Sequence, residues 1–294
     1  MKRIPRFLSV ITIIMLLLSG CGLFQSCGGS SDLTVHFIDV GQADSALVVC
    51  GNFSMLIDGG NSADSDLIYS FLKNQGISEL DYIVATHAHE DHVGGLSGAL
   101  NYAKVKTAYS PTTEHDSKAF RNFVRYLDNQ GVSITVPNHG ETFMLGDAEV
   151  EILGPVNPSK ELNNTSIILK ITYGSTSFLF TGDAEREEEA DILQADYDLS
   201  STVLKVGHHG SDTSTTYPFL REIMPQYAVI SCGKNNSYGH PHENTLSRLR
   251  DADAILYRTD IQGTITCTSD GKSVSFSVER NLDEQTNPTE HAAE

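Results

Sequence analysis

The chain has 294 residues, of which 39% are hydrophobic and 20% charged, a composition typical of a globular protein that can bury a full core. Its 20 basic and 38 acidic residues give a formal net charge of -18. That charge argues against a broad nucleic-acid surface, because phosphate contacts need clustered Lys and Arg, but it is compatible with a phosphate held by metal cations in one cleft. Trp is absent, so any base-stacking platform would consist of Tyr or Phe.

The N-terminus has the pattern of an export signal. Lys2, Arg3 and Arg6 precede the apolar run FLSVITIIMLLLSG and then Cys21. The tetrapeptide LSGC resembles the bacterial lipobox, so we expect residues 1–20 to be a lipoprotein signal peptide and Cys21 to be the lipidation site. This places the protein on the extracytoplasmic face of the bacterial cell membrane, with the membrane as a partner through the lipid. An uncleaved anchor is the alternative, although the run is shorter than the roughly 20 residues that a span needs.

The rest of the chain reads as one mixed α/β domain between two polar ends. We expect residues 21–32 to be a flexible tether, 33–280 the folded domain and 281–294 an acidic, disordered tail. Strands and helices alternate along the domain. Strands are predicted at 33–40, 45–49, 54–58, 82–87, 104–110, 133–136, 141–145, 148–153, 166–173, 177–182, 201–206, 228–232, 255–259, 263–267 and 273–278, and helices at 64–74, 93–103, 117–130, 184–194, 216–224 and 243–251. This order predicts two mixed sheets packed together with helices outside.

Metal-ligand residues follow several of these strands. THAHEDHVGG, at residues 86–95, puts His87, His89, Asp91 and His92 within six residues. Asp58, Asp183, the pair His208-His209 and the pair His240-His242 come after other strands or in the loops that follow them, which is where α/β folds place their chemistry. Imidazole and carboxylate ligands suit zinc, with manganese as an alternative. Asp183 stands alone at a strand end, as a carboxylate bridging two ions would, and two ions could activate a water and polarise a phosphoryl oxygen.

At this point a resemblance is clear. HAHEDH resembles the HxHxDH signature of the metallo-β-lactamase fold, which implies a four-layer αβ/βα sandwich over residues 33–280. FIDVGQADSALV, LNNTSIILKITYGSTSFLFTGDAE, LKVGHHGSDTST and YGHPHENTL resemble the C-terminal extracellular domain of the ComEC competence family and its free-standing lipoprotein relatives. No stretch resembles the membrane channel of that family.

The resemblance implies roles for the residues of the motifs. His87, His89, Asp91, His92 and Asp183 become ligands of two divalent metal ions, Asp91 also orients the attacking water, and Asp58 accepts hydrogen bonds under the metal loop. The last ligand stays open: either His209 binds metal and His240 contacts substrate, or His240 binds metal and His208-His209 donate a proton to the leaving oxygen. Asn164, Ser211 and His242 are candidate substrate-binding residues. Asp39 and Asp44 are expected to shape the loop beside the site.

One departure from the wider family pattern bears on the substrate. Asn163-Asn164-Thr165 stands where many members have a further His before the hairpin, and His115 and His139 are the nearest His in sequence. This departure favours phosphoester chemistry over a β-lactamase or thioester reaction. We expect an exported, metal-dependent hydrolase of phosphoesters or phosphodiesters, with DNA or RNA as the possible substrate and no evident protein partner. The alternatives are a cell-surface phosphoesterase acting on wall polymers and a non-catalytic binding lipoprotein.

The cysteines allow free thiols or one disulfide. Cys27, Cys50, Cys232 and Cys267 remain after Cys21, in no metal-site spacing. Cys232 and Cys267, which both belong to predicted strands, are the expected pair if a disulfide forms.

Overall fold

Two β-sheets face each other in the computed structural model, which describes residues 32–280. The predictions for the signal peptide, Cys21, the tether up to residue 31 and the tail at 281–294 lie outside the described residues. The first sheet has the order β15 (Val274–Val278), β14 (Ile265–Ser269), β1 (Leu33–Phe37), β2 (Ala46–Cys50), β3 (Phe53–Ile57), β4 (Glu79–Val84), β5 (Lys104–Tyr109), β6 (Ile134–Thr135). The second has the order β13 (Ile255–Arg258), β12 (Tyr227–Ile230), β11 (Val203–Lys205), β10 (Thr176–Phe180), β9 (Ile168–Tyr173), β8 (Ala148–Gly154), β7 (Thr142–Leu145).

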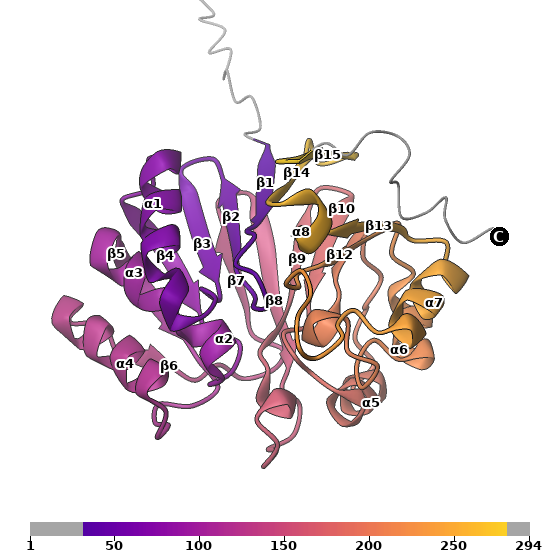
Figure 1. Ribbon diagram of the computed structural model, residues 1–294, viewed down its shortest axis with the longest axis horizontal. Helices are drawn as coiled ribbons and strands as arrows, with labels where there is room; N and C mark the ends of the chain where they lie inside the picture. Colours follow the sequence, from indigo (N-terminus) through magenta and orange to yellow (C-terminus); the bar gives the residue numbers. More distant parts are fainter. Residues whose placement is uncertain (1–31, 281–294) are drawn as a thin grey trace, which may run out of the picture.

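Helices cover both outer faces (Figure 1). The first sheet carries α1 (Ser65–Gln75), α2 (Glu90–Val93), α3 (Leu96–Tyr102) and α4 (Lys118–Gln130), and the second carries α5 (Arg186–Gln194), α6 (Tyr217–Ile223) and α7 (Glu243–Asp251). The remaining helical pieces are α8 (Thr259–Gln262), η1 (Ser62–Asp64), η2 (Asn163–Thr165) and η3 (Gly207–Gly210). Within residues 32–280 no helix combines the length and apolar character that crossing a membrane requires.

Three apolar cores fill the spaces between the four layers of sheets and helices. The central one joins the two sheets, and in it Phe37 of β1 stacks on Phe180 of β10 with ring centroids 5.8 Å apart. The other two fill the space between each sheet and its helices, with Leu72 of α1 and Phe123 of α4 on one side and Ile192 of α5 on the other. The predicted αβ/βα sandwich is therefore confirmed, and its strands read as apolar runs because both faces of each sheet are covered.

Of the two states that the sequence left open for the cysteines, the described residues show free thiols rather than a Cys232–Cys267 disulfide. Cys50, Cys232 and Cys267 are free and buried. Cys267 points into the layer between the sheets, whereas Cys232 belongs to the layer between the second sheet and its helices. Two thiols in different layers cannot bond without moving a strand.

Strand direction determines where chemistry can gather. β3, β4, β5 and β6 run parallel, as do β10, β11, β12 and β13, whereas the other described pairs are antiparallel. Parallel neighbours bring their carboxyl ends to one edge, so the loops after β3, β4, β10, β11 and β12 meet there.

Candidate metal centre

The HAHEDH loop is fixed by backbone contact with the loop after β3. Gly59 donates its N–H to His92 O at 2.7 Å, and Gly95 donates to Gly60 O at 3.0 Å. A Cβ built on Gly95 would lie 1.9 Å from Gly59 O, so no larger residue fits at this close approach. The glycines that follow the HAHEDH motif therefore position the histidines.

Residues 32–280 contain three groups of potential metal ligands: two share the carboxylate of Asp183, and the third consists of Asp44, Asp58 and His92. Of the two that share Asp183, one consists of His87, His89 and Asp183 and the other of Asp91, His92, Asp183 and His209, with ligand atoms within 4.8 Å of one another in each. Asp183 Oδ2 lies 3.9 Å from His87 Nε2, 3.3 Å from His92 Nε2 and 3.6 Å from His209 Nε2. Asp183 thus occupies the central position expected from the sequence.

The far nitrogen of each of these three rings is held by the protein. His92 Nδ1 donates to Asp58 Oδ2 at 2.8 Å, and His209 Nδ1 donates to the carbonyl of Ser231 at 3.1 Å. His87 Nδ1 lies 3.2 Å from the Thr86 hydroxyl. An imidazole whose Nδ1 carries the proton offers a bare Nε2, which is the form that binds a metal.

Asp58 joins the loop after β3 to the HAHEDH loop after β4. It is 1% exposed and accepts from Thr86 N at 2.8 Å, from Thr86 Oγ1 at 2.7 Å and from His92. Asp58, His208 and His209 have φ of 57°, 48° and 53°, in the left-handed region that non-glycine residues rarely adopt. Such backbone strain concentrates at functional sites, where surrounding contacts enforce it.

A buried ion pair behind the centre was missed by sequence reasoning. Lys205 Nζ lies 2.7 Å from Asp44 Oδ2, and both side chains are nearly inaccessible. The other carboxylate oxygen of Asp44 lies 3.2 Å from His209 Nδ1. Lys205 is the last residue of β11, and a single Lys in the apolar run VLKV gives no signal that an acid from the loop between β1 and β2 will contact it.

The charges around Asp183 favour the binding of a cation. Burial opposes ionisation of Asp183, yet His92 and His209 hold its pKa well below the usual range. Burial would lower the pKa of His209, but Asp183 and Asp44 raise it to about 10. His92 Nε2, His209 Nε2 and Asp183 Oδ1 are buried without a hydrogen-bond partner. Buried polar atoms are rarely left unsatisfied, so three of them in one place, on donor types that zinc and manganese accept, fit a metal-binding role.

A cavity of about 270 Å³ opens beside these groups. His89, Asp91, Asp183 and His209 form its floor, and the remaining lining residues are Gln42, Glu90, Asn163, His208, Tyr238 and His240. His208 Nε2 lies 3.7 Å from Asp183 Oδ2, while its Nδ1 lies 3.2 Å from Glu185 Oε1. His240 belongs to neither ligand group.

Other predicted site residues bond to protein groups. Asn164 Oδ1 accepts from Glu185 N at 2.9 Å, and the Ser211 hydroxyl lies 3.0 Å from that of Thr213. His242, the residue at the N-terminus of α7, accepts from Asp212 N at 3.0 Å. None of these three lines the cavity, and their contact with substrate stays a prediction. His115 and His139 bond to Ser117 and Tyr197, outside both ligand groups.

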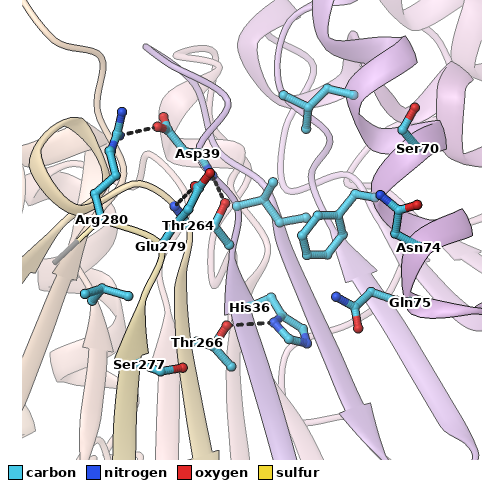
Figure 2. Close-up of a pocket in the computed structure, with 14 residues that line it drawn as sticks. His36, Asp39, Ser70, Asn74, Gln75, Thr264, Thr266, Ser277, Glu279 and Arg280 are labelled. Atoms are coloured by element: carbon cyan, nitrogen blue, oxygen red, sulfur yellow. Dashed lines mark hydrogen bonds and ion pairs between the residues drawn. The ribbon is translucent and has the colours of Figure 1, made fainter.

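A second, larger hollow lies away from the ligand groups around Asp183. Figure 2 shows this cavity of about 600 Å³, which β1, β14 and α1 line. His36 bonds to Thr266 there at 2.9 Å, and Arg280 pairs with Asp39 at 2.6 Å. Among the described residues it contains no ligand group of the kind found around Asp183, so the chemistry belongs to the smaller cavity.

The fold and this centre define a class: a two-sheet α/β protein with paired His/Asp metal-ligand groups at the edge between its sheets. The chain belongs to the metallo-β-lactamase superfamily, whose family pattern matches residues 38–234.

Two relatives and one solved structure are similar to this chain. The chain is 32% identical to ComE operon protein 3 of Bacillus subtilis over 85% of its own length, and 30% identical to competence protein ComA of Neisseria gonorrhoeae over 89%. It spans only 34% and 36% of the lengths of those proteins. The metallo-β-lactamase fold protein YhfI of Bacillus subtilis superimposes with a TM-score of 0.54 at 13% identity, covering 81% of this chain and all of that one. That likeness concerns the fold alone.

Proposed function

We propose that this protein is a metal-dependent phosphodiesterase that acts on nucleic acid. The single observation that carries the proposal is the pair of ligand groups that share Asp183, which provide for two cations side by side. The similarity to competence proteins over most of the chain supports a nucleic-acid substrate.

Each residue of the centre has a role in this proposal. His87, His89 and Asp183 would hold one ion, and Asp91, His92, His209 and Asp183 the other. The ions would supply an activated water and polarise the phosphoryl oxygen. Asp91 is partly exposed on the cavity floor, where it can orient the attacking water.

His208 and His240 would act on the substrate from the cavity wall. His208 Nδ1 is held by Glu185, so its Nε2 faces the floor and can pass a proton to the leaving oxygen. His209 is then the last ligand and His240 a substrate contact, the first of the two arrangements that the sequence left open.

Hydrolysis of a phosphodiester tests the proposal. Purified protein reconstituted with zinc or manganese should cleave bis(p-nitrophenyl) phosphate and single-stranded DNA. Asp91→Ala should reduce kcat/KM by at least about 100-fold, because it removes a metal ligand and the group that orients water. The matched control is Asp128→Ala, an exposed acid on α4 outside the cavity. Equal turnover by Asp91→Ala and the control would refute the mechanism.

The proposal also includes export of the protein and its attachment to the membrane by a lipid. Export on a lipidated Cys21 rests on the N-terminal sequence pattern, and these residues lie outside the described part of the chain. Radiolabelled palmitate incorporation that is lost in Cys21→Ala would support it. Hydrolysis of wall-polymer phosphodiesters in preference to DNA would support the surface phosphoesterase, and absence of bound metal would support the binding lipoprotein.

A further inference from the structure

The loop after β12 presents an exposed aromatic ring at the mouth of the cavity beside the metal-ligand groups. Tyr238 is 66% exposed and lines this cavity. An exposed tyrosine beside a reaction centre is available to contact substrate.

The loop is rigidly held. Asn236 Oδ1 accepts from Tyr238 N at 3.1 Å and from His240 N at 3.0 Å, and its Nδ2 donates to Gly233 O at 2.9 Å. His242 accepts from Asp212 N through Nδ1, so its Nε2 carries the proton and donates to Tyr238 O at 3.1 Å. Four hydrogen bonds from the side chains of Asn236 and His242 thus fix the backbone that carries the tyrosine, which lowers the entropy lost when a ligand binds.

Gln42 joins the loop to the first sheet across the cavity. Its Oε1 accepts from Gly233 N at 3.0 Å, which fixes the amide orientation, and its Nε2 then donates to His240 Nδ1 at 3.3 Å. The neutral His240 ring must therefore carry its proton on Nε2. A protonated Nε2 serves as a hydrogen-bond donor, which fits a substrate contact.

Three rings form a stepped column from the metal centre to the surface. The His209 and His240 rings are 6.3 Å apart at 25°, and the His240 and Tyr238 rings are 5.6 Å apart, also at 25°. The column begins at a metal-ligand candidate and ends at an exposed face. Another flat ring placed on Tyr238 would continue this offset stacking.

The cavity lacks the usual device for holding a polyanion. None of its lining residues in the described chain is Lys or Arg, and Glu90 and Asp91 add negative charge. With a volume of about 270 Å³, just below the roughly 300 Å³ at which small-molecule sites begin, it accommodates the reacting phosphate and leaves an attached base outside. Stacking on aromatic rings binds bases without depending on cationic side chains.

We propose that Tyr238, backed by His240, is a stacking platform for the nucleobase next to the phosphodiester that the metal centre cleaves. The platform makes the protein prefer single-stranded, base-bearing nucleic acid over a base-free polyol phosphate polymer. This inference rests on the proposed function, which it deepens.

Kinetics with two matched substrates tests the platform. The substrates are a short single-stranded oligodeoxynucleotide and an abasic backbone of the same length. Tyr238→Ala should raise KM for the base-bearing strand, with little change in kcat, and should reduce its preference over the abasic strand about tenfold, the magnitude of one lost base–aromatic stack. Tyr238→Phe should retain the preference, since it keeps the ring. An unchanged preference in Tyr238→Ala would overturn the inference.

A binding readout separates failure of the platform from failure of the proposed function. The chain has no Trp, so Tyr238→Trp places a single tryptophan at the platform whose fluorescence can be excited apart from that of the tyrosines, and Tyr217→Trp places one on α6 as a control. Adenosine 5′-monophosphate should quench the first and not the second, and ribose 5-phosphate should quench neither. Quenching in a protein that cleaves no phosphodiester would leave the platform standing and reject the hydrolase. Cleavage without selective quenching would reject the platform alone.

Discussion

At the scale of single residues, Asp58 determines which nitrogen of His92 is free. Its carboxylate accepts from Thr86 N and from His92 Nδ1, so it fixes the ring orientation and leaves His92 Nε2 facing Asp183. Asp58→Asn replaces one acceptor oxygen with a donor, which opposes one of those bonds. We expect metal affinity to fall about 10- to 100-fold, the usual effect of losing such a partner.

A chelator-competition titration measures this affinity. Asp39→Asn is the control, because Asp39 makes an ion pair with Arg280 at the larger hollow rather than at the metal centre. Equal affinities in the two variants would contradict the role of Asp58.

Lys205 is the second residue whose effect can be predicted. Lys205→Met removes one partner of the buried pair and leaves Asp44 charged between the sheets. Removing one member of a buried pair costs about 3–5 kcal/mol. Lys106→Met, at a half-exposed ammonium that pairs with exposed Glu79 and mostly buried Asp81, should cost clearly less, because solvent screens exposed ion pairs. Urea unfolding of both variants makes the comparison, and equal losses would contradict it.

At the scale of elements, apolar runs and punctuating glycines predicted most of the architecture. The helix predicted to end at Gly131 does so, with that glycine left-handed at the C-cap of α4. Residues in one segment were predictable as a metal motif because HAHEDH is local. The choice among His208, His209 and His240 was not, since it depends on how β11 and β12 pair and on the left-handed turn of η3.

The features that the sequence left open or did not reveal have one physical origin. Cys232 and Cys267 belong to different layers, and Lys205 of the second sheet pairs with Asp44 in the loop between β1 and β2 of the first. Strand patterns give the alternation of side chains but not which buried face receives a particular residue when both faces are covered. The sheet-to-sheet contacts of the centre therefore required the structure.

A buried carboxyl in α5 leads us to expect that the stability of the fold depends on pH. Glu188 of α5 is 2% exposed, and burial raises the pKa of its carboxyl to about 7, although Val156 N donates to it at 2.8 Å. The folded pKa exceeds the unfolded one, so the folded state binds the extra proton and stability falls as pH rises from about 4.5 through 7.

Glu188→Gln keeps the acceptor oxygen and removes this titration. The variant should match the wild type near pH 4.5 and exceed it by about 1–3 kcal/mol at pH 8. Denaturant melts across this range measure the difference, in which every other titrating group cancels. Parallel stability curves would contradict the assignment.

At the scale of the whole molecule, the metal centre joins the two sheets. HAHEDH follows a strand of the first sheet, whereas Asp183 and His209 follow strands of the second, so a cation bound between them would cross-link both halves. A ligand that binds only the folded state, at a concentration of 100 Kd, adds about 2.7 kcal/mol of stability. For a domain of this size that corresponds to a rise in Tm of about 5–10 °C.

Differential scanning fluorimetry with zinc, manganese or excess chelator tests this cross-link. Metal should raise Tm relative to the chelated protein, and Asp183→Asn should lose most of that rise because Asp183 belongs to both ligand groups. Asp128→Asn, on the exposed face of α4, should keep the full rise. His89→Ala, which touches one group only, should lose part of it, so the order wild type, His89→Ala, Asp183→Asn distinguishes a shared carboxylate from two independent sites. An equal loss in His89→Ala and Asp183→Asn would show that one cation, rather than two, connects the sheets.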